Sequence, residues 1–169
     1  MDKLEKKIIE LIELIRVSFE NVKLENGISW LEAYEISSYG NLERKKLARN
    51  RDKKNDWTNI PSVLIENLKY QDTLSFLDYT GLKYYLPVCM IYNLKNYTKS
   101  ESLIINSIIY KLTEKKTAKE LQIILNKKQK ECIVKFLSLC LEIGDNYFDL
   151  HKVETRTKKY WLENISYNK

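Results

Sequence analysis

Apolar residues recur every three or four positions along much of this chain, which is the spacing of amphipathic helices. The clearest early stripe lies within residues 3–23 and consists of Leu4, Ile8, Leu11, Ile12, Ile15, Phe19 and Val22. Asn26 and Gly27 follow it, and both residue types tolerate the left-handed backbone that ends helices. We therefore expect a long N-terminal helix that ends before a tight turn.

Two capping boxes mark further helix starts, because Ser29 precedes Glu32 by three residues and Asn126 precedes Gln129 by three. The first box predicts a short helix that ends around residues 37–40. The second predicts the helix with the clearest apolar face, which Gly144 ends. A final helix is expected from about residue 145 to residue 165.

The middle of the chain predicts shorter elements. Residues 56–61 form a turn, and Pro61 is expected as the first residue of a helix that continues to Leu68. We expect a break at Gly81 and then a buried helix over residues 84–92. The remaining expected features are Pro87 in the first turn of that helix, a helix that Ser100 opens, and a short helix or turn over 117–125. A strand is the alternative for residues 84–92, because so short an apolar run fits either structure.

Few turn-forming residues are present. The 169 residues include four Gly and two Pro, whereas a β-sandwich or barrel needs turn residues about every eight to twelve positions. The length suits one domain with one hydrophobic core, and no fixed-period repeat indicates a solenoid. We predict an all-α fold, with residues 1–169 forming a single domain. It would be a bundle-like array of six to eight helices with no substantial sheet.

Hydrophobic residues make up 44% of the chain and charged residues 31%, as is typical of folded proteins. No apolar run is long enough to span a membrane, and charges interrupt the N-terminal stripe where a signal peptide would be apolar. Cys132 and Cys140 are about 12 Å apart if they share a helix, too far for a disulfide. With Cys89 they are expected to be buried reduced thiols in a cytoplasmic protein.

Residues 76–87 have the sequence FLDYTGLKYYLP. This segment resembles the FLDxxGxxxYLP signature of a family of small, uncharacterised bacterial proteins. Other features agree with that family in their order along the chain, namely Trp57 with Ile60 and Pro61, the helix containing Gln129, and Tyr160 with Trp161. The resemblance implies the fold and a bacterial origin, and it assigns no site because the family has no established activity.

Asp78, Tyr84 and Tyr85 are the most specific candidate site. An acid beside two tyrosines could line a pocket or face a partner. The favoured interpretation is structural: Asp78 accepts backbone N–H groups, and Gly81 supplies a positive φ. No second acid or base lies at the spacing of a general acid/base pair, so we predict no catalytic residue and no cofactor.

His151 is the single histidine in the sequence. It shares one side of a predicted helix with Glu154, but two ligands do not make a zinc site. We therefore predict no metal site, although residues distant in sequence could still converge in the fold.

Seven basic residues gather between residues 41 and 54 in a chain of net charge +6, and they are Arg44, Lys45, Lys46, Arg49, Arg51, Lys53 and Lys54. This basic segment could contact phosphates. A second group could add a surface for stacking bases, and it comprises Arg156, Lys158, Lys159, Tyr160 and Trp161. However, no nucleic-acid-binding signature is present, and charge runs are usually solvated faces.

Twelve Tyr and three Trp give the chain many aromatic side chains. Those left at the surface would be the usual anchors of protein interfaces. We predict a non-enzymatic protein-binding module, for example an immunity or antitoxin protein, whose partner has an acidic face because this chain is basic. The alternatives are a basic nucleic-acid-binding domain and an enzyme with a pocket near Asp78, Tyr84 and Tyr85. The oligomeric state is not predicted.

Overall fold

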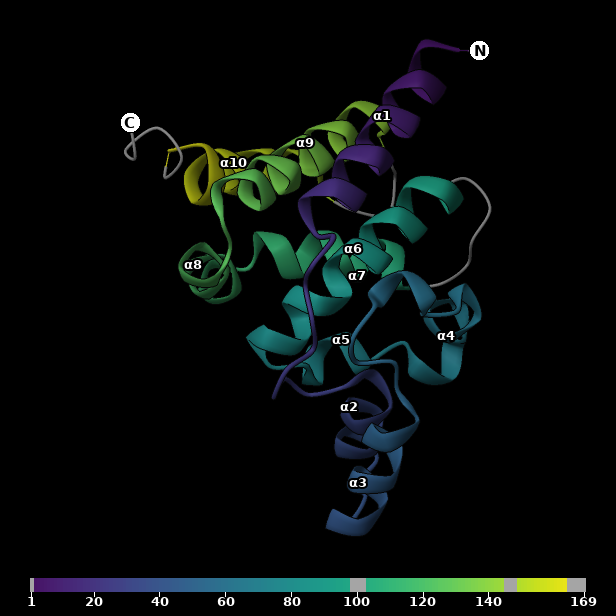
Figure 1. Ribbon diagram of the computed structural model, residues 1–169. Helices are drawn as coiled ribbons and strands as arrows, with labels where there is room; N and C mark the ends of the chain where they lie inside the picture. The colour runs from purple at the N-terminus through teal and green to yellow at the C-terminus, as the bar shows by residue number, and fades with distance from the viewer. Residues whose placement is uncertain (1, 98–102, 145–148, 164–169) are drawn as a thin grey trace. The chain divides into compact units, whose positions relative to one another are not determined.

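The computed structural model describes residues 2–97, 103–144 and 149–163 (Figure 1). Over these residues the chain forms ten α-helices and three short helical turns of other types, and it forms no strand. The all-α prediction is confirmed, whereas the count of six to eight helices was too low. Helices such as α4 and α5 have five and four residues, which is too short for a helical period to show in the sequence.

The α-helices are α1 (Lys3–Ser18), α2 (Trp30–Ser37), α3 (Leu42–Arg51), α4 (Ser62–Glu66), α5 (Thr73–Phe76), α6 (Tyr79–Asn96), α7 (Ile104–Thr113), α8 (Lys115–Ile124), α9 (Lys127–Ile143) and α10 (Leu150–Thr157). The short turns are η1 (Trp57–Asn59), η2 (Leu68–Tyr70) and the π-helical η3 (Lys158–Leu162). The predicted start at Ser100 lies outside the described residues. So do residues 145–148 and 164–165 of the predicted final helix.

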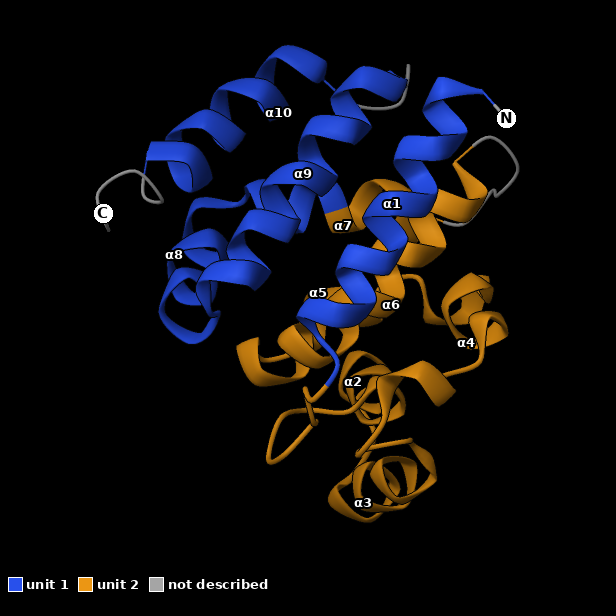
Figure 2. Cartoon of the chain, turned by 45° about the horizontal axis from the view of Figure 1, so that its top comes forward, with its two compact units in different colours: residues 1–20, 109–169 blue, residues 21–108 orange. Residues whose placement is uncertain are grey.

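The chain folds into two compact units (Figure 2). Unit 1 combines residues 1–20 with residues 109–169, and unit 2 comprises residues 21–108. The backbone therefore leaves unit 1 after α1 and returns to it within α7. Each unit has its own set of buried apolar side chains.

Unit 1 is built around α9, which packs against α1 and α10. The predicted capping box is present, since the N–H of Gln129 donates to Asn126 Oδ1 at 2.9 Å and the N–H of Asn126 donates to Gln129 Oε1 at 3.1 Å. Gln129 is buried, and its Nε2 donates to the carbonyl oxygen of Ser18 at 3.2 Å. This bond joins the start of α9 to the end of α1.

Two ends of the unit 1 helices test the sequence predictions directly. The helix α1 ends at Ser18 rather than near Lys23, and Phe19 is buried in the turn that follows. Gly144 ends α9 as predicted, and its φ of +67° explains why glycine stands there.

Unit 2 is built around α6, which contacts η1 and α4, while α2 packs against α3 and α5. The predicted break at Gly81 and the predicted helix start near Tyr84 were wrong. Helix α6 begins after Asp78 and passes through both Gly81 and Pro87, so the strand alternative for residues 84–92 was also wrong. Pro87 lies inside this helix and is buried. Because proline has no backbone N–H, the helix has one hydrogen-bond donor fewer at this position.

Candidate functional site

Asp78 is the N-cap of α6. Its Oδ1 accepts the N–H of Gly81 at 2.8 Å and the N–H of Ile28 at 2.9 Å. The structural interpretation of Asp78 is confirmed, and the second bond adds what the sequence did not indicate. The same carboxylate ties the loop before α2 to the first turn of α6.

Gly81 lies within α6 and does not have the positive φ that was predicted from the sequence. Among the described glycines, the one with a positive φ is Gly144. Glycine is needed there for space. A Cβ on Gly81 would overlap the carbonyl oxygen of Ile28 and lie 2.9 Å from Asp78 Oδ1. A Cβ on Gly27 would overlap the backbone of Gly81 in turn. The two glycines therefore allow two backbone segments to touch.

Tyr84 and Tyr85 are buried, with 0% and 1% of their surface exposed. The Tyr84 hydroxyl donates to the carbonyl oxygen of Lys53 at 3.0 Å, and the Tyr85 hydroxyl accepts the N–H of Trp30 at 3.0 Å. Burial raises the pKa of both phenols above the ordinary value, and the nearby acids add to this effect. Neither ring offers a surface to a protein partner, but Tyr85 lines a pocket of unit 2.

Asp52 also lines that pocket, and it is not among the residues that the sequence predicted as a site. Only 8% of its surface is exposed, and its Oδ2 accepts the N–H of Leu31 at 2.7 Å. Burial raises the pKa of this carboxyl, while the Ser29 hydroxyl, the Leu31 N–H and the Arg49 guanidinium oppose that rise. An acid between Arg51 and Lys53 resembles a solvated residue in sequence, so no local signal marks it as buried.

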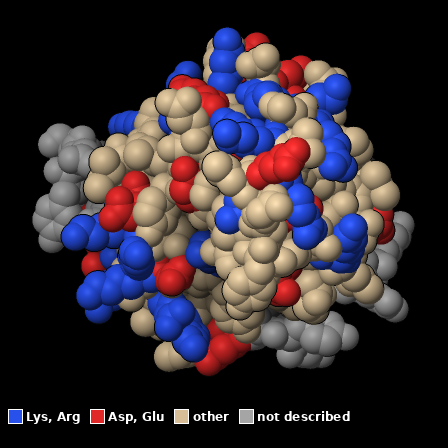
Figure 3. Space-filling model, turned by 90° about the horizontal axis from the view of Figure 1, so that it is seen from below, with Lys and Arg blue, Asp and Glu red and all other residues tan. Residues whose placement is uncertain are grey.

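The basic segment does not act as one surface. The Arg49 guanidinium donates to the carbonyl oxygens of Gly27 and Glu25 and pairs with Glu32 at 3.0 Å. Arg44 pairs with Glu35 at 2.8 Å. Figure 3 views the molecule from below, where α3 lies in Figure 1, and shows groups of basic atoms separated by acidic and uncharged ones. Part of this charge is therefore structural or neutralised.

Lys45 and Lys46 lie in the N-terminal half of α3, where Lys45 is half-buried and Lys46 is exposed. Neither forms a salt bridge with any residue that the structure describes. Leu42, Lys45 and Lys46 are separated by three and four residues, so they share one face of the helix. Leu42 is 68% exposed.

Tyr39 occupies the turn that joins α2 to α3. The N–H of Gly40 donates to the carbonyl oxygen of Glu35 at 2.7 Å, and the N–H of Tyr39 donates to that of Ile36 at 3.2 Å. These two bonds form a Schellman motif with Tyr39 at its left-handed position, where glycine is usual. Tyr39 has a φ of +56° and is 96% exposed. We call Tyr39, Leu42, Lys45 and Lys46 the tip surface.

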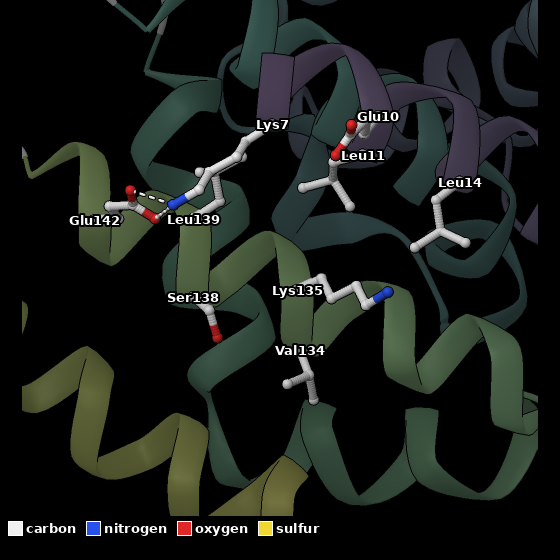
Figure 4. A pocket seen from close by; sticks show the side chains of 9 residues that line it. All are labelled: Lys7, Glu10, Leu11, Leu14, Val134, Lys135, Ser138, Leu139 and Glu142. Atoms are coloured by element: carbon white, nitrogen blue, oxygen red, sulfur yellow. Dashed lines mark hydrogen bonds and ion pairs between the residues drawn. The ribbon is translucent and has the colours of Figure 1, made fainter. Parts of the chain in front are cut away.

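A groove of about 490 Å³ lies in unit 1 between α1 and α9 (Figure 4). Its apolar lining includes Leu11, Leu14 and Leu139. Lys7 spans one end, where its Nζ lies 2.5 Å from Glu142 Oε1. The other charged lining residues are Glu10 and Lys135, so two lysines balance two glutamates and the groove has no net charge.

The remaining candidates have structural positions. Trp161 is fully buried and its Nε1 donates to the carbonyl oxygen of Leu112 at 2.9 Å, so it offers no stacking surface beside Arg156, Lys158, Lys159 and Tyr160. His151 and Glu154 are exposed. Residues 2–97, 103–144 and 149–163 contain no group of three or more potential ligands that could hold a metal ion.

The three cysteines are free and buried, as predicted. Burial raises the pKa of the Cys89 and Cys132 thiols to about 12, and that of Cys140 is raised as well. Thiols in this state are poor nucleophiles at neutral pH. None of the helices in the described part of the chain is long and apolar enough to cross a membrane.

Comparison with known proteins places these features in a family. Residues 7–165 match the family described as "Family of unknown function (DUF6714)". The chain belongs to this family. No curated protein and no solved structure matches it. The predicted membership in an uncharacterised family is confirmed, and the function is inferred from the site geometry.

Proposed function

We propose that this chain is a non-enzymatic protein-binding module that docks its tip surface on a partner with an acidic face. The observation that carries the proposal is Tyr39, which is 96% exposed on a backbone of φ +56°. An immunity or antitoxin protein, which blocks its target by surface complementarity, is the form of this function that we favour. The native partner would then be a toxin.

The backbone at Tyr39 is energetically unfavourable for a residue with a Cβ. Left-handed backbone costs a residue other than glycine about 1–2 kcal/mol. The Tyr39 ring gains almost no packing within its own chain, because nearly all of it is exposed. Contact with another molecule accounts for a strained residue whose side chain extends into solvent.

The positive charge of the tip surface indicates that its partner has an acidic face. Lys45 and Lys46 lie one helical turn beyond Leu42 on the same face of α3. Tyrosine is a common interface anchor because it buries a large area and loses little conformational entropy. The complementary surface is an apolar pocket for the Tyr39 ring, bordered by carboxylates that meet the two lysines.

The sharpest test is Tyr39→Gly, because the same change should improve the fold and remove the anchor. Glycine adopts φ +56° without strain, so we expect the free energy of unfolding to stay equal or rise by about 1 kcal/mol. Binding to the partner should weaken by about 30-fold or more, as is typical for a hot-spot anchor. A binding defect in this variant is therefore not explained by unfolding.

The partner is first captured from an extract of the native host on the wild-type chain, with and without nuclease, and its affinity is then measured with purified proteins. Val17→Ala is the control, because Val17 is 66% exposed and lies on α1, outside the tip surface. The proposal requires a nuclease-resistant partner that wild type and Val17→Ala bind and Tyr39→Gly does not. A partner that Tyr39→Gly binds with unchanged affinity contradicts it.

The tip surface also supports the nucleic-acid alternative, because an exposed tyrosine beside lysines could stack a base. The dependence of binding on salt concentration distinguishes a nucleic-acid partner from a protein partner. Binding to nucleic acid weakens steeply with salt concentration as counterions are released from phosphates. Recovery of nucleic acid alone, lost after nuclease treatment and in Lys45→Glu/Lys46→Glu, overturns the protein-partner proposal in favour of this alternative.

A further inference from the structure

A second site lies in unit 2, in the pocket that contains Asp52. Its volume is about 360 Å³, within the range of pockets that bind small molecules. Residues from separate segments of unit 2 line it, namely Leu31, Asp52, Ile60, Leu64, Tyr70 and Tyr85. Arg51, Lys53 and Asn67 also belong to the lining.

Two buried residues with polar side chains, Asp52 and Tyr85, belong to the lining of this pocket. Asp52 supplies a carboxylate that accepts the N–H of Leu31 at Oδ2 and also interacts with the Ser29 hydroxyl, and a carboxylate has further acceptor positions. The Tyr85 hydroxyl accepts the N–H of Trp30, which leaves its own hydrogen for donation. The lining of the pocket therefore includes an acceptor and a donor for the same ligand.

The other sides of the pocket differ in character. Leu31, Ile60 and Leu64 provide apolar walls, and Tyr70 adds an aromatic ring. Arg51 and Lys53 are exposed residues of the lining, so their cationic groups can remain in water while they attract an anion. A matching ligand has a flat ring with a donor and an acceptor on one edge, and an anionic group attached to it.

We propose that this pocket binds a guanine nucleotide. The N1–H and 2-amino groups of guanine are adjacent donors that suit the Asp52 carboxylate, and the neighbouring O6 suits the Tyr85 hydroxyl. The phosphate would lie toward Arg51 and Lys53. Adenine offers one donor on the corresponding edge and should bind more weakly. This site is independent of the tip surface.

The test uses the full chain and GMP as the probe, with AMP, XMP and inorganic phosphate for comparison, by isothermal titration calorimetry. We expect GMP to bind at least about tenfold more tightly than AMP, since a missing hydrogen bond leaves a buried polar group unpaired. Inorganic phosphate should bind far more weakly than GMP.

Asp52→Asn provides the decisive variant. Asparagine keeps an oxygen that can accept the Leu31 N–H, and its amide can donate to the O2 of xanthine, which replaces the 2-amino group of guanine. The preference should therefore change from GMP to XMP, and a damaged fold would not produce that reversal. Lys45→Glu, on the tip surface, should leave GMP binding unchanged.

Three outcomes overturn the proposal. GMP does not bind at about 1 mM, where even a weak site would be partly filled. Alternatively, GMP and inorganic phosphate bind equally, which would mean that the base is not recognised. Finally, Asp52→Asn retains the wild-type order of GMP over XMP, which would mean that Asp52 does not read the base.

Discussion

Gly81 illustrates how a single position can carry a requirement that its local structure hides. In the first turn of a helix, alanine has the better helix propensity by about 1 kcal/mol. The neighbouring backbone reverses that preference, because the carbonyl oxygen of Ile28 occupies the space that a Cβ would need. The close approach also places the Ile28 N–H on Asp78 Oδ1.

We predict that Gly81→Ala lowers the free energy of unfolding by about 2–3 kcal/mol, as overpacking of a rigid contact does. Urea denaturation measures this change. Gly144→Ala is the comparison, because Gly144 has positive φ but open space around it, and it should lose about 1 kcal/mol. A stabilised Gly81→Ala would show that the Ile28 loop can move away at little cost.

Asp52 gives stability a defined pH dependence. Its pKa in the folded chain is raised above the ordinary value of 3.8, so in the window just above 3.8 the folded state binds more protons than the unfolded state. The free energy of unfolding contributed by this group therefore falls as pH rises through that window. Asparagine does not titrate, so Asp52→Asn lacks the contribution.

We expect the Tm of the wild type, relative to that of Asp52→Asn, to rise as pH is lowered from about 7 to about 4. Thermal unfolding of both proteins across this range provides the measurement, and their difference removes the titration of all other groups. A Tm difference that stays constant with pH would show that Asp52 titrates normally.

At the scale of elements, α3 combines a structural side and an open end. Arg49 holds the loop before α2 through two carbonyl oxygens and a carboxylate, whereas Lys45 and Lys46 lie near the tip turn. Sequence composition alone presents all of these residues as one basic segment. Their roles separate because the Arg49 guanidinium bonds to the backbone of another segment, whereas Lys45 and Lys46 form no salt bridge with a described residue.

We predict that Arg49→Lys lowers the free energy of unfolding by about 1.5–3 kcal/mol, because a lysine cannot reproduce the planar fork that reaches two carbonyl oxygens at once. Lys46→Gln should change it by no more than about 0.5 kcal/mol. Chemical denaturation of the two variants checks this contrast. If the two variants were equally stable, the hydrogen bonds of Arg49 would contribute no more to stability than a solvated lysine does.

At the scale of the whole molecule, the two units share one chain in an interleaved order. Residues 1–20 belong with residues 109–169, and α7 crosses the boundary between the units. The single-domain prediction requires the units to unfold together. Tryptophans report on each unit, since Trp161 lies in unit 1 while Trp30 and Trp57 lie in unit 2.

We predict one cooperative transition, because melting of α7 would disrupt both units. Trp161→Phe leaves tryptophan fluorescence from unit 2 alone, and Trp30→Phe/Trp57→Phe leaves tryptophan fluorescence from unit 1 alone. Within each variant, the fluorescence midpoint in urea should coincide with the midpoint from far-ultraviolet circular dichroism, which reports on all helices. Separate midpoints would establish two independently unfolding domains.

The sequence by itself determined the all-α class, the long helices α1 and α9, the Asn126–Gln129 capping box, the end of α9 at Gly144 and the role of Asp78 as an acceptor of backbone N–H groups. These features depend on side chains three or four residues apart, so their spacing is visible in the chain. Family membership was predicted from the sequence as well, and the match over residues 7–165 shows it.

Only the tertiary structure decided the roles of Gly81, Arg49, Asp52 and Tyr39. Gly81 and Arg49 meet the loop before α2, and Asp52 is buried by segments distant from it in sequence. Tyr39 has a left-handed backbone, which its residue type does not predict. The physical reason is common to the four residues. Burial and close approach depend on which distant segments meet, and backbone strain depends on how the chain turns. The spacing of residues along the sequence does not encode these properties.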